Sequence, residues 1–203
     1  QKAGKTEGWH DAAFFNIAKV LEITLNNGKV GDKQLGPQTG DMTSFHSVDD
    51  IFAAYKKQME YCISLLVNAD NAIDVAHAKR CPLPFLSSMI DDCIARGKTV
   101  QEGGAVYNFT GPQGFGIANV ADSLYTIKKL VFEEKRYTGD ELLQAVYDNW
   151  EGHDQLYALV NSSKIHHYGN DDDYADELFK FMFECYCKNV AGRTTPRGGQ
   201  FNP

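Results

Sequence analysis

The chain has 203 residues, of which 43% are hydrophobic and 23% are charged, and its formal net charge is −7. These are ordinary values for a globular protein and exclude a disordered chain, and no apolar run approaches the roughly 18 residues of a membrane helix. The 27 acidic and 20 basic residues argue against a general nucleic-acid binder, which needs a basic face for the phosphates.

The first predicted helix covers residues 11–27. Asp11 is a suitable N-cap, and Gly28 follows the end as a left-handed C-cap. The helix is apolar almost all round, as is typical of a helix buried in a large protein. His10 and Asp11 at the N-terminus of this helix must be hydrogen-bonded or exposed. Two roles for Asp11 remain open: capping the helix, or binding a polar, uncharged group such as a hydroxyl in a cavity.

After a polar, glycine-rich loop, a second helix is predicted from Ser47 toward His77, with Asp50 completing a capping box. Four further helices are predicted over 85–96, 117–131, 138–150 and 174–190. The clearest strand signal is 105–110, followed by a glycine-rich turn at 111–116. Because a lone strand leaves its backbone groups unpaired, we expect its partners in another copy or elsewhere in a longer polypeptide.

The glycine-rich turn does not fit a nucleotide-binding loop. It has no Lys for a phosphate loop, and Asn119 stands where the third glycine of a dinucleotide fingerprint belongs. The turn is therefore interpreted as a site of close backbone approach. His166 and His167 precede an acidic stretch, but adjacent histidines diverge and no His-x-x-x-His occurs. We interpret them as solvated side chains beside a helix cap rather than as metal ligands.

Five cysteines are present, an odd number without a Cys-x-x-Cys motif, which indicates a reducing, cytoplasmic setting. Cys185 and Cys187 lie two apart on a predicted helix, point in different directions and are interpreted as half-buried thiols. A Gly-x-Ser-x-Gly motif, which would indicate a serine hydrolase, does not occur in the sequence. The cysteines and serines therefore give no reason to assign a metal site or a catalytic nucleophile to the chain.

Four segments carry a family resemblance. Their sequences are KTEGWHDAAFF (5–15), EGGAVYNFTGPQ (102–113), YGNDDD (168–173) and TPRGG (195–199). Together they resemble the pyruvate formate-lyase-like glycyl radical enzymes, and among these the glycerol and propane-1,2-diol dehydratases that work without cobalamin. The resemblance covers the whole chain in order.

The resemblance implies an α/β fold, in which this chain is a mostly helical fragment of the ten-stranded glycyl radical enzyme barrel. Residues 1–203 would form part of the catalytic barrel domain, with the cysteine loop and the glycyl radical domain outside the chain. The absence of an initiator Met and the loop-like end agree with a fragment. Such a fragment is expected to be inactive alone and to leave large apolar surfaces exposed.

The resemblance also implies the chemistry of the parent enzyme. That enzyme is a lyase that dehydrates glycerol or propane-1,2-diol to an aldehyde, after an S-adenosylmethionine-dependent iron–sulfur activase has installed a glycyl radical. A homodimer is expected, in the cytoplasm, with a bacterial microcompartment as the alternative location. The alternatives for function are a choline-type or sulfonate lyase of the same superfamily, or a non-catalytic binding or assembly piece.

The resemblance assigns one substrate-binding residue. Asp11 stands where diol dehydratases place an aspartate that hydrogen-bonds the substrate hydroxyls. His10 is interpreted as a structural histidine, and Asn108 and Thr110 as residues of a barrel strand without an assigned contact. The segment that begins at Arg197 leads toward a loop that borders the pocket in the family.

Overall fold

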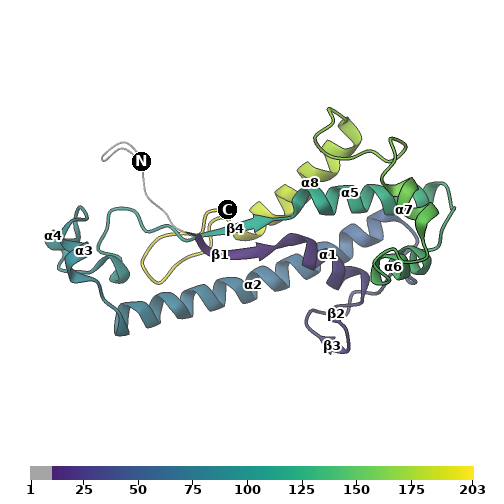
Figure 1. Cartoon of the computed structure of the whole chain (residues 1–203). Helices are drawn as coiled ribbons and strands as arrows, with labels where there is room; N and C mark the ends of the chain where they lie inside the picture. Colours follow the sequence, from purple (N-terminus) through teal and green to yellow (C-terminus); the bar gives the residue numbers. More distant parts are fainter. Residues whose placement is uncertain (1–10) are drawn as a thin grey trace. The chain divides into compact units, whose positions relative to one another are not determined.

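The computed structural model describes residues 11–203, and of Asp11 only the backbone. The elements are β1 (Asp11–Asn16), α1 (Ile17–Leu25), β2 (Lys29–Val30), β3 (Lys33–Gln34), α2 (Val48–Arg80), α3 (Pro84–Ser88), α4 (Cys93–Arg96), a 3-10 turn (Val100–Glu102), β4 (Gly111–Phe115), α5 (Ile117–Ile127), a π-helical turn (Lys128–Glu133), α6 (Gly139–Tyr147), α7 (Asp154–Val160) and α8 (Asp173–Val190) (Figure 1). None of the described helices is long and apolar enough to cross a membrane.

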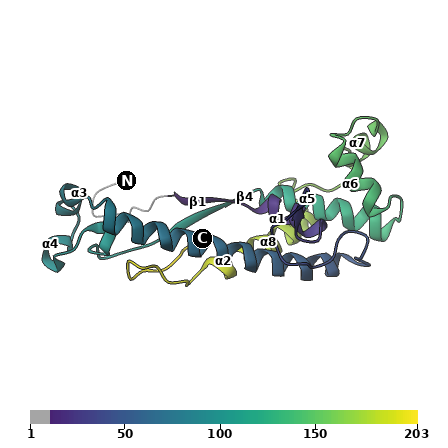
Figure 2. The same ribbon diagram turned by 90° about the horizontal axis from the view of Figure 1, so that it is seen from below.

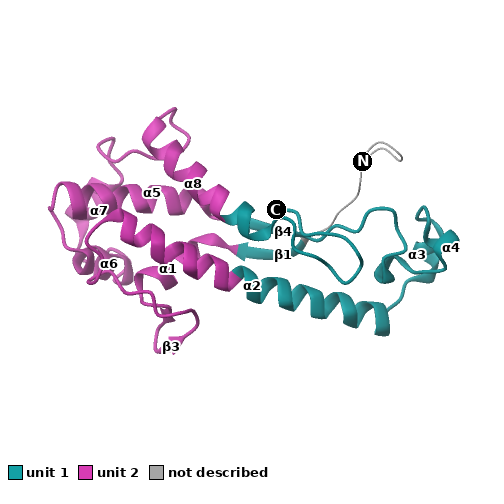
Figure 3. Ribbon diagram, turned by 180° about the vertical axis from the view of Figure 1, so that it is seen from behind, with its two compact units in different colours: residues 1–15, 63–114, 186–203 teal, residues 16–62, 115–185 magenta. Residues whose placement is uncertain are grey.

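The chain divides into two compact units (Figure 3). Unit 1 comprises residues 1–15, 63–114 and 186–203, and unit 2 comprises residues 16–62 and 115–185. Within the described part of unit 1, β1 pairs with β4 and α3 lies against α4 (Figures 1 and 2). In unit 2, α1 packs against α5, and β2 and β3 form a short antiparallel hairpin.

The first predicted helix begins six residues later than expected. Residues 11–16 form β1, and the N-cap of α1 is Asn16, whose side-chain oxygen accepts a hydrogen bond from the backbone N–H of Lys19 at 3.0 Å. The predicted N-cap role of Asp11 is therefore wrong. The apolar residues 12–15 suit a paired strand as well as a helix, and pairing with β4 decides between them. Gly28 does adopt the expected left-handed conformation, with a φ of 80°.

The second helix is confirmed and is longer than predicted. In its capping box, Asp50 accepts hydrogen bonds from the backbone N–H groups of His46 and Ser47, which lower the pKa of the Asp50 carboxyl. The Ser47 hydroxyl in turn accepts from the N–H of Asp50. The helix continues to Arg80, just before Pro82, because a proline removes a backbone donor and clashes with the preceding turn.

The helix predicted over 85–96 is broken in two. α3 ends at Ser88 and α4 starts at Cys93, since Asp92 takes a left-handed φ of 72°. Gly97 ends α4 in the same conformation, as predicted. The two short helices and the residues that flank α3 expose large apolar side chains, which are those of Leu83, Phe85, Leu86, Met89 and Ile94.

The predicted strand is displaced by several residues. β4 covers 111–115, the segment predicted as a turn, whereas Thr110 alone of the predicted strand makes a bridge, to Phe201. The reason lies in the carbonyl groups. The Ala105 carbonyl accepts from the side chains of Arg96 and Asn108, and the Phe109 carbonyl accepts from Arg197. These carbonyls are therefore hydrogen-bonded to side chains rather than to a neighbouring strand. The strand is also not alone, because β1 is its partner.

The C-terminal helices follow the prediction more closely. The capping box of Thr138 and Glu141 is present at the start of α6, and α8 covers the last predicted helix. α6 ends at Tyr147, before the predicted Trp150. The helix α7 was not predicted.

Candidate functional site

Three of the four segments that carry the family resemblance meet in unit 1. They are residues 11–15 on β1, residues 102–113 leading into β4, and residues 195–199 in the C-terminal loop. Thr110 connects the second segment to the residues that directly follow the third, since its N–H donates to the Gln200 carbonyl at 3.1 Å and its carbonyl accepts from the N–H of Asn202 at 3.0 Å. The loop after α8 is thereby fastened to the beginning of β4.

Arg197 is the side chain that ties this region together. Its Nε lies 3.0 Å from Oδ2 of Asp74 on α2, and the two side chains are only 12% and 17% exposed. Its Nη2 donates to the carbonyl of Phe109 and to the hydroxyl of Thr110, both at 2.8 Å. A charged donor in bidentate or forked contacts of this kind makes strong, directional hydrogen bonds. Arg197 therefore fixes the residues immediately before β4.

The backbone around Arg197 leaves no space for side chains at two glycines. A Cβ atom on Gly199 would lie 1.7 Å from the Asn108 carbonyl oxygen, and one on Gly103 would lie 2.2 Å from the Arg197 carbonyl oxygen. Gly103 also has a left-handed φ of 82°. The glycines of these two segments are thus required by the close approach of one segment to the other.

Asp70 and Tyr186 lie in the same unit and are both buried. The Tyr186 hydroxyl donates to the carbonyl of Pro112 in β4 at 2.6 Å, and its ring stacks on Phe15 of β1 with 5.8 Å between centroids. Burial raises the pKa of Tyr186, with the nearby Cys187 and Asp70 adding to the shift. Tyr186 therefore holds both strands of the β1–β4 pair from the side of α8.

Burial, and secondarily the charge of Asp74, raises the pKa of Asp70 to about 6. Its Oδ2 atom is buried and makes no hydrogen bond among the described residues. A carboxyl whose pKa is higher in the folded than in the unfolded state binds more protons when folded, so its ionisation lowers the free energy of unfolding as the pH rises from about 4 to 6.

We expect Asp70→Asn to stabilise the protein above pH 7 by about 2 kcal/mol, because the substitution removes a buried charge and keeps the side-chain shape. The gain should disappear below about pH 3, where the carboxyl is protonated in both states. Urea unfolding at the two pH values measures it. Asp74→Asn is the matched control and should destabilise, since Asp74 pairs with Arg197. A gain for Asp70→Asn that is equal at both pH values would contradict the burial argument.

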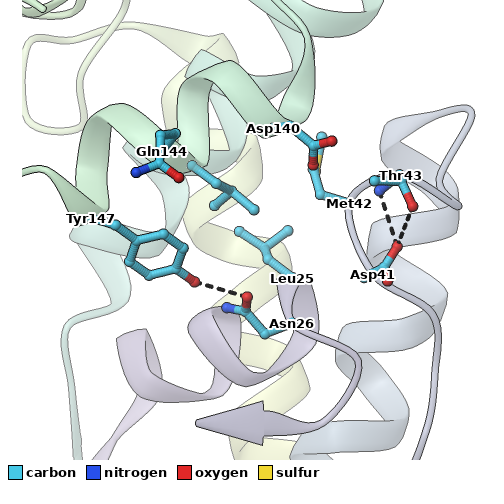
Figure 4. Close-up of a pocket in the computed structure, with 9 residues that line it drawn as sticks. Leu25, Asn26, Asp41, Met42, Thr43, Asp140, Gln144 and Tyr147 are labelled. Carbon is cyan, nitrogen blue, oxygen red and sulfur yellow. Dashed lines mark hydrogen bonds between the residues drawn. The ribbon is translucent and has the colours of Figure 1, made fainter. Parts of the chain in front are cut away.

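Unit 2 contains a pocket of about 270 Å³ at the end of α1, beside α6 (Figure 4). Tyr147 donates to Oδ1 of Asn26 at 2.8 Å across it, and Oδ1 of Asp41 accepts from the N–H and the hydroxyl of Thr43. These polar groups satisfy one another, and no residue of the four family segments lines the pocket. It is not the site that the sequence predicts.

The fourth family segment, 168–173, also lies in unit 2. His166 pairs through Nδ1 with Oδ2 of Asp172, whose Oδ1 accepts from the N–H of Tyr174 in the first turn of α8. His167 Nδ1 lies 3.3 Å from Oδ2 of Asp122. Asp172 thus provides the helix cap that was predicted in this acidic stretch, whereas the two histidines, predicted to be solvated, are paired with carboxylates. Among the described residues, no group of three potential ligands could hold a metal ion.

The predicted site residues that the structure describes all belong to unit 1. Asp11 is the first residue of β1, in the strand pair that the Arg197 contacts support, while His10 lies outside the described residues. Asn108 and Thr110 are buried against the C-terminal loop. Sequence reasoning missed Asp74, because nothing in a helical pattern reveals that one acidic residue on α2 pairs with an arginine 123 positions away.

The comparisons with known proteins agree with this arrangement. The family described as "Pyruvate formate lyase-like" matches residues 1–203. The (2S)-3-sulfopropanediol dehydratase of Klebsiella oxytoca is 55% identical over 203 residues, which are 99% of this chain and 25% of that protein.

Two solved structures are similar along the whole chain. The glycerol-bound B12-independent glycerol dehydratase of Clostridium butyricum has a TM-score of 0.91 at 48% identity, and the structure concerned with 1,2-propanediol dehydration in Roseburia inulinivorans has a TM-score of 0.90 at 51% identity. Each alignment covers 100% of this chain and 26% of the other. This chain thus spans about a quarter of the length of these relatives.

The predicted fold class is confirmed, since the structural neighbours are glycyl radical enzyme barrels and this chain corresponds to a mostly helical part of one. Sequence and structure agree over the full length, including the segments that meet around Arg197. The chain belongs to the pyruvate formate lyase-like family.

Proposed function

We propose that this chain is part of the catalytic barrel of an enzyme that dehydrates a small 1,2-diol to an aldehyde. The observation that carries the proposal is the coincidence of two features. Asp11, in the segment GWHDAAFF, begins β1, and the relatives with 48–55% identity act on or bind sulfopropanediol, propanediol or glycerol. All three compounds carry hydroxyls on adjacent carbons.

Asp11 would bind the diol. A carboxylate only accepts hydrogen bonds when it is ionised, so it suits a substrate whose donors are hydroxyl groups. Two adjacent hydroxyls on one carboxylate fix the orientation of the carbon–oxygen bond that breaks. A glycyl radical, installed in the full-length protein by an activating enzyme, would supply the hydrogen-atom abstraction that begins the reaction.

The β1–β4 strand pair would hold Asp11 in a fixed position. β4 is held at its start by the contacts of Arg197 and along its length by Tyr186, and β1 pairs with β4. The exposed apolar side chains on α3 and α4 and that of Phe14, 70% exposed, are surfaces that the remainder of a longer polypeptide would cover. A sealed site of this kind would exclude the water that quenches radical intermediates.

The test is a substrate panel on the full-length protein after activation. Glycerol, propane-1,2-diol and (2S)-3-sulfopropanediol are supplied separately, and the aldehyde product is measured. We expect aldehyde from at least one diol. The controls are 2-hydroxyethanesulfonate, which has one hydroxyl, and choline, which carries a quaternary ammonium. Release of sulfite or trimethylamine without aldehyde from any diol would overturn the proposal in favour of the sulfonate-lyase or choline-lyase alternative.

We further propose that the full-length protein is a homodimer and that residues 1–203 form one part of its catalytic domain. The cysteine that attacks the substrate and the radical glycine would then lie outside these residues, and this chain alone would be inactive. Cytoplasmic location is part of the same proposal, with a microcompartment as the alternative.

A further inference from the structure

A second pocket in unit 2 concentrates positive charge. It has a volume of about 370 Å³, and its cationic lining residues are Lys129, Arg136 and Lys164, with the imidazole of His166 beside them. One carboxylate, that of Glu134, also lines it. Among the described residues, none of the three cations lies within ion-pair distance of a carboxylate.

This arrangement is unusual in a chain with a net charge of −7. Like charges that line one pocket repel one another, and this repulsion is offset only by solvent or by a bound anion. The chain has an excess of acidic residues that could pair with these cations, but in the described structure they do not. The three cations thus line the pocket together with Glu134 but without an ion-pair partner among the described residues.

Two of the groups are held in place. Nζ of Lys129 donates to the Lys164 carbonyl and lies 5.7 Å from the centroid of the Tyr125 ring. His166 is oriented by its Nδ1 contact with Asp172, which leaves Nε2 without a hydrogen bond to the described residues. A pocket whose donors are already positioned loses less side-chain freedom on binding.

The backbone of the pocket wall is also irregular. Lys129 and Leu130 belong to the π-helical turn that follows α5, and Lys135 next to it has a left-handed φ of 51°. π-helical turns are rare and frequently occur at functional sites. Here the turn places Lys129 and the Arg136 segment on the same pocket.

Leu159 is partly exposed and supplies the accessible apolar surface of the pocket, whereas Leu130 and Ile165 are buried, with exposures of 0% and 2%. The hydroxyl of Ser163 is a further polar group in the lining. Cationic side chains next to a partly exposed leucine, in a pocket with a volume in the range of small-molecule sites, fit a ligand with an anionic group on a short hydrocarbon body.

We propose that the pocket lined by Lys129, Arg136, Lys164 and His166 binds a small organic anion, namely a phosphate, sulfonate or carboxylate with a short apolar chain. The anionic oxygens would accept from the guanidinium and the two ammonium groups, and the hydrocarbon would lie on Leu159. Its lining residues belong to unit 2, whereas those of the proposed diol site belong to unit 1.

Calorimetric titration of the full-length protein tests the site, with inorganic phosphate and monobutyl phosphate as probes at constant ionic strength. We expect one site per chain and a Kd for monobutyl phosphate about tenfold lower than that for phosphate, because the butyl group would be removed from water. Equal affinity for the two probes would overturn the contact with Leu159, and no binding of either would overturn the site.

Charge-removing variants locate the binding. The double variant Arg136→Gln with Lys164→Gln should weaken monobutyl phosphate binding at least tenfold. The matched control is Lys29→Gln with Lys33→Gln, which removes two exposed lysines of the β2–β3 hairpin that do not line the pocket, and it should bind as the parent does. Similar losses in both double variants would show nonspecific attraction and overturn the proposal. Circular dichroism confirms that each variant is folded.

Discussion

Replacing Asp11 by Ala is expected to lower the rate of diol dehydration at least about 100-fold in the full-length protein. The carboxylate would orient the substrate hydroxyls, and misplacement of a reacting group by about 1 Å can cost a factor of roughly 10². The glycyl radical should still form, because the substitution removes a contact to the substrate and not the stored radical. Aldehyde production and the paramagnetic resonance signal are measured on the same activated sample.

Two variants show whether this loss reflects binding. Asp11→Asn keeps the side-chain volume and one acceptor oxygen, and we expect intermediate activity with a raised KM. Asp91→Ala removes an exposed carboxylate between α3 and α4 and should leave turnover unchanged. Full turnover in Asp11→Ala would refute the substrate-binding role while leaving the family assignment intact.

The substitution Arg197→Gln is expected to reduce the free energy of unfolding by about 3 kcal/mol. It would leave the Asp74 carboxylate, which is only 17% exposed, without its counterion, and breaking one side of a buried pair costs about 3–5 kcal/mol. It would also remove the charged donor to the Phe109 carbonyl and to Thr110. The urea unfolding midpoint measures the effect.

Arg193→Gln is the matched control, since Arg193 lies in the same loop. Its side chain donates to the Asn189 carbonyl and to the Ser64 hydroxyl but contacts no carboxylate in the described ion pairs. We expect a loss of about 1 kcal/mol, the usual value for a hydrogen bond. Equal losses in the two variants would mean that the Arg197–Asp74 pair adds nothing beyond hydrogen bonding.

An Arg197→Gln variant also connects stability with the proposed function. Because Thr110 leads directly into β4 and β4 pairs with β1, loosening its start should disturb the position of Asp11. We therefore expect this variant to turn over the diol more slowly even at urea concentrations at which it is still folded. Arg197 would act by positioning the strand pair, so the dehydration rate at saturating diol should fall while the radical yield stays constant.

Local signals in the sequence identified the features that depend on neighbouring residues. The capping boxes at Ser47 and Thr138 were found because their side chains bond to backbone groups three residues away, and Gly28 and Gly97 were found because only glycine takes a left-handed φ without strain. Such interactions form within one turn of the chain and do not require tertiary structure.

The strands could not be located in this way. Residues 12–15 have an apolar pattern that suits a helix or a strand, and residues 111–115 contain the glycines and proline of a turn. Their conformation depends on pairing with each other across about 100 residues. Pro112 is the second residue of β4, a strand with one partner in the described two-stranded sheet, where a missing N–H donor is tolerated. Its carbonyl accepts a hydrogen bond from Tyr186.

By itself, the sequence determined the capped helix starts after Ser47 and Thr138, the family and the candidate substrate residue Asp11, because each of these is written in continuous runs of residues. Only the tertiary structure decided that Asp11 lies on a strand, that Asp74 pairs with Arg197, and that three cations line one pocket in unit 2. The physical reason is that strand pairing, ion pairing and pocket formation join residues from distant parts of the chain, and their partners are selected by packing rather than by local sequence.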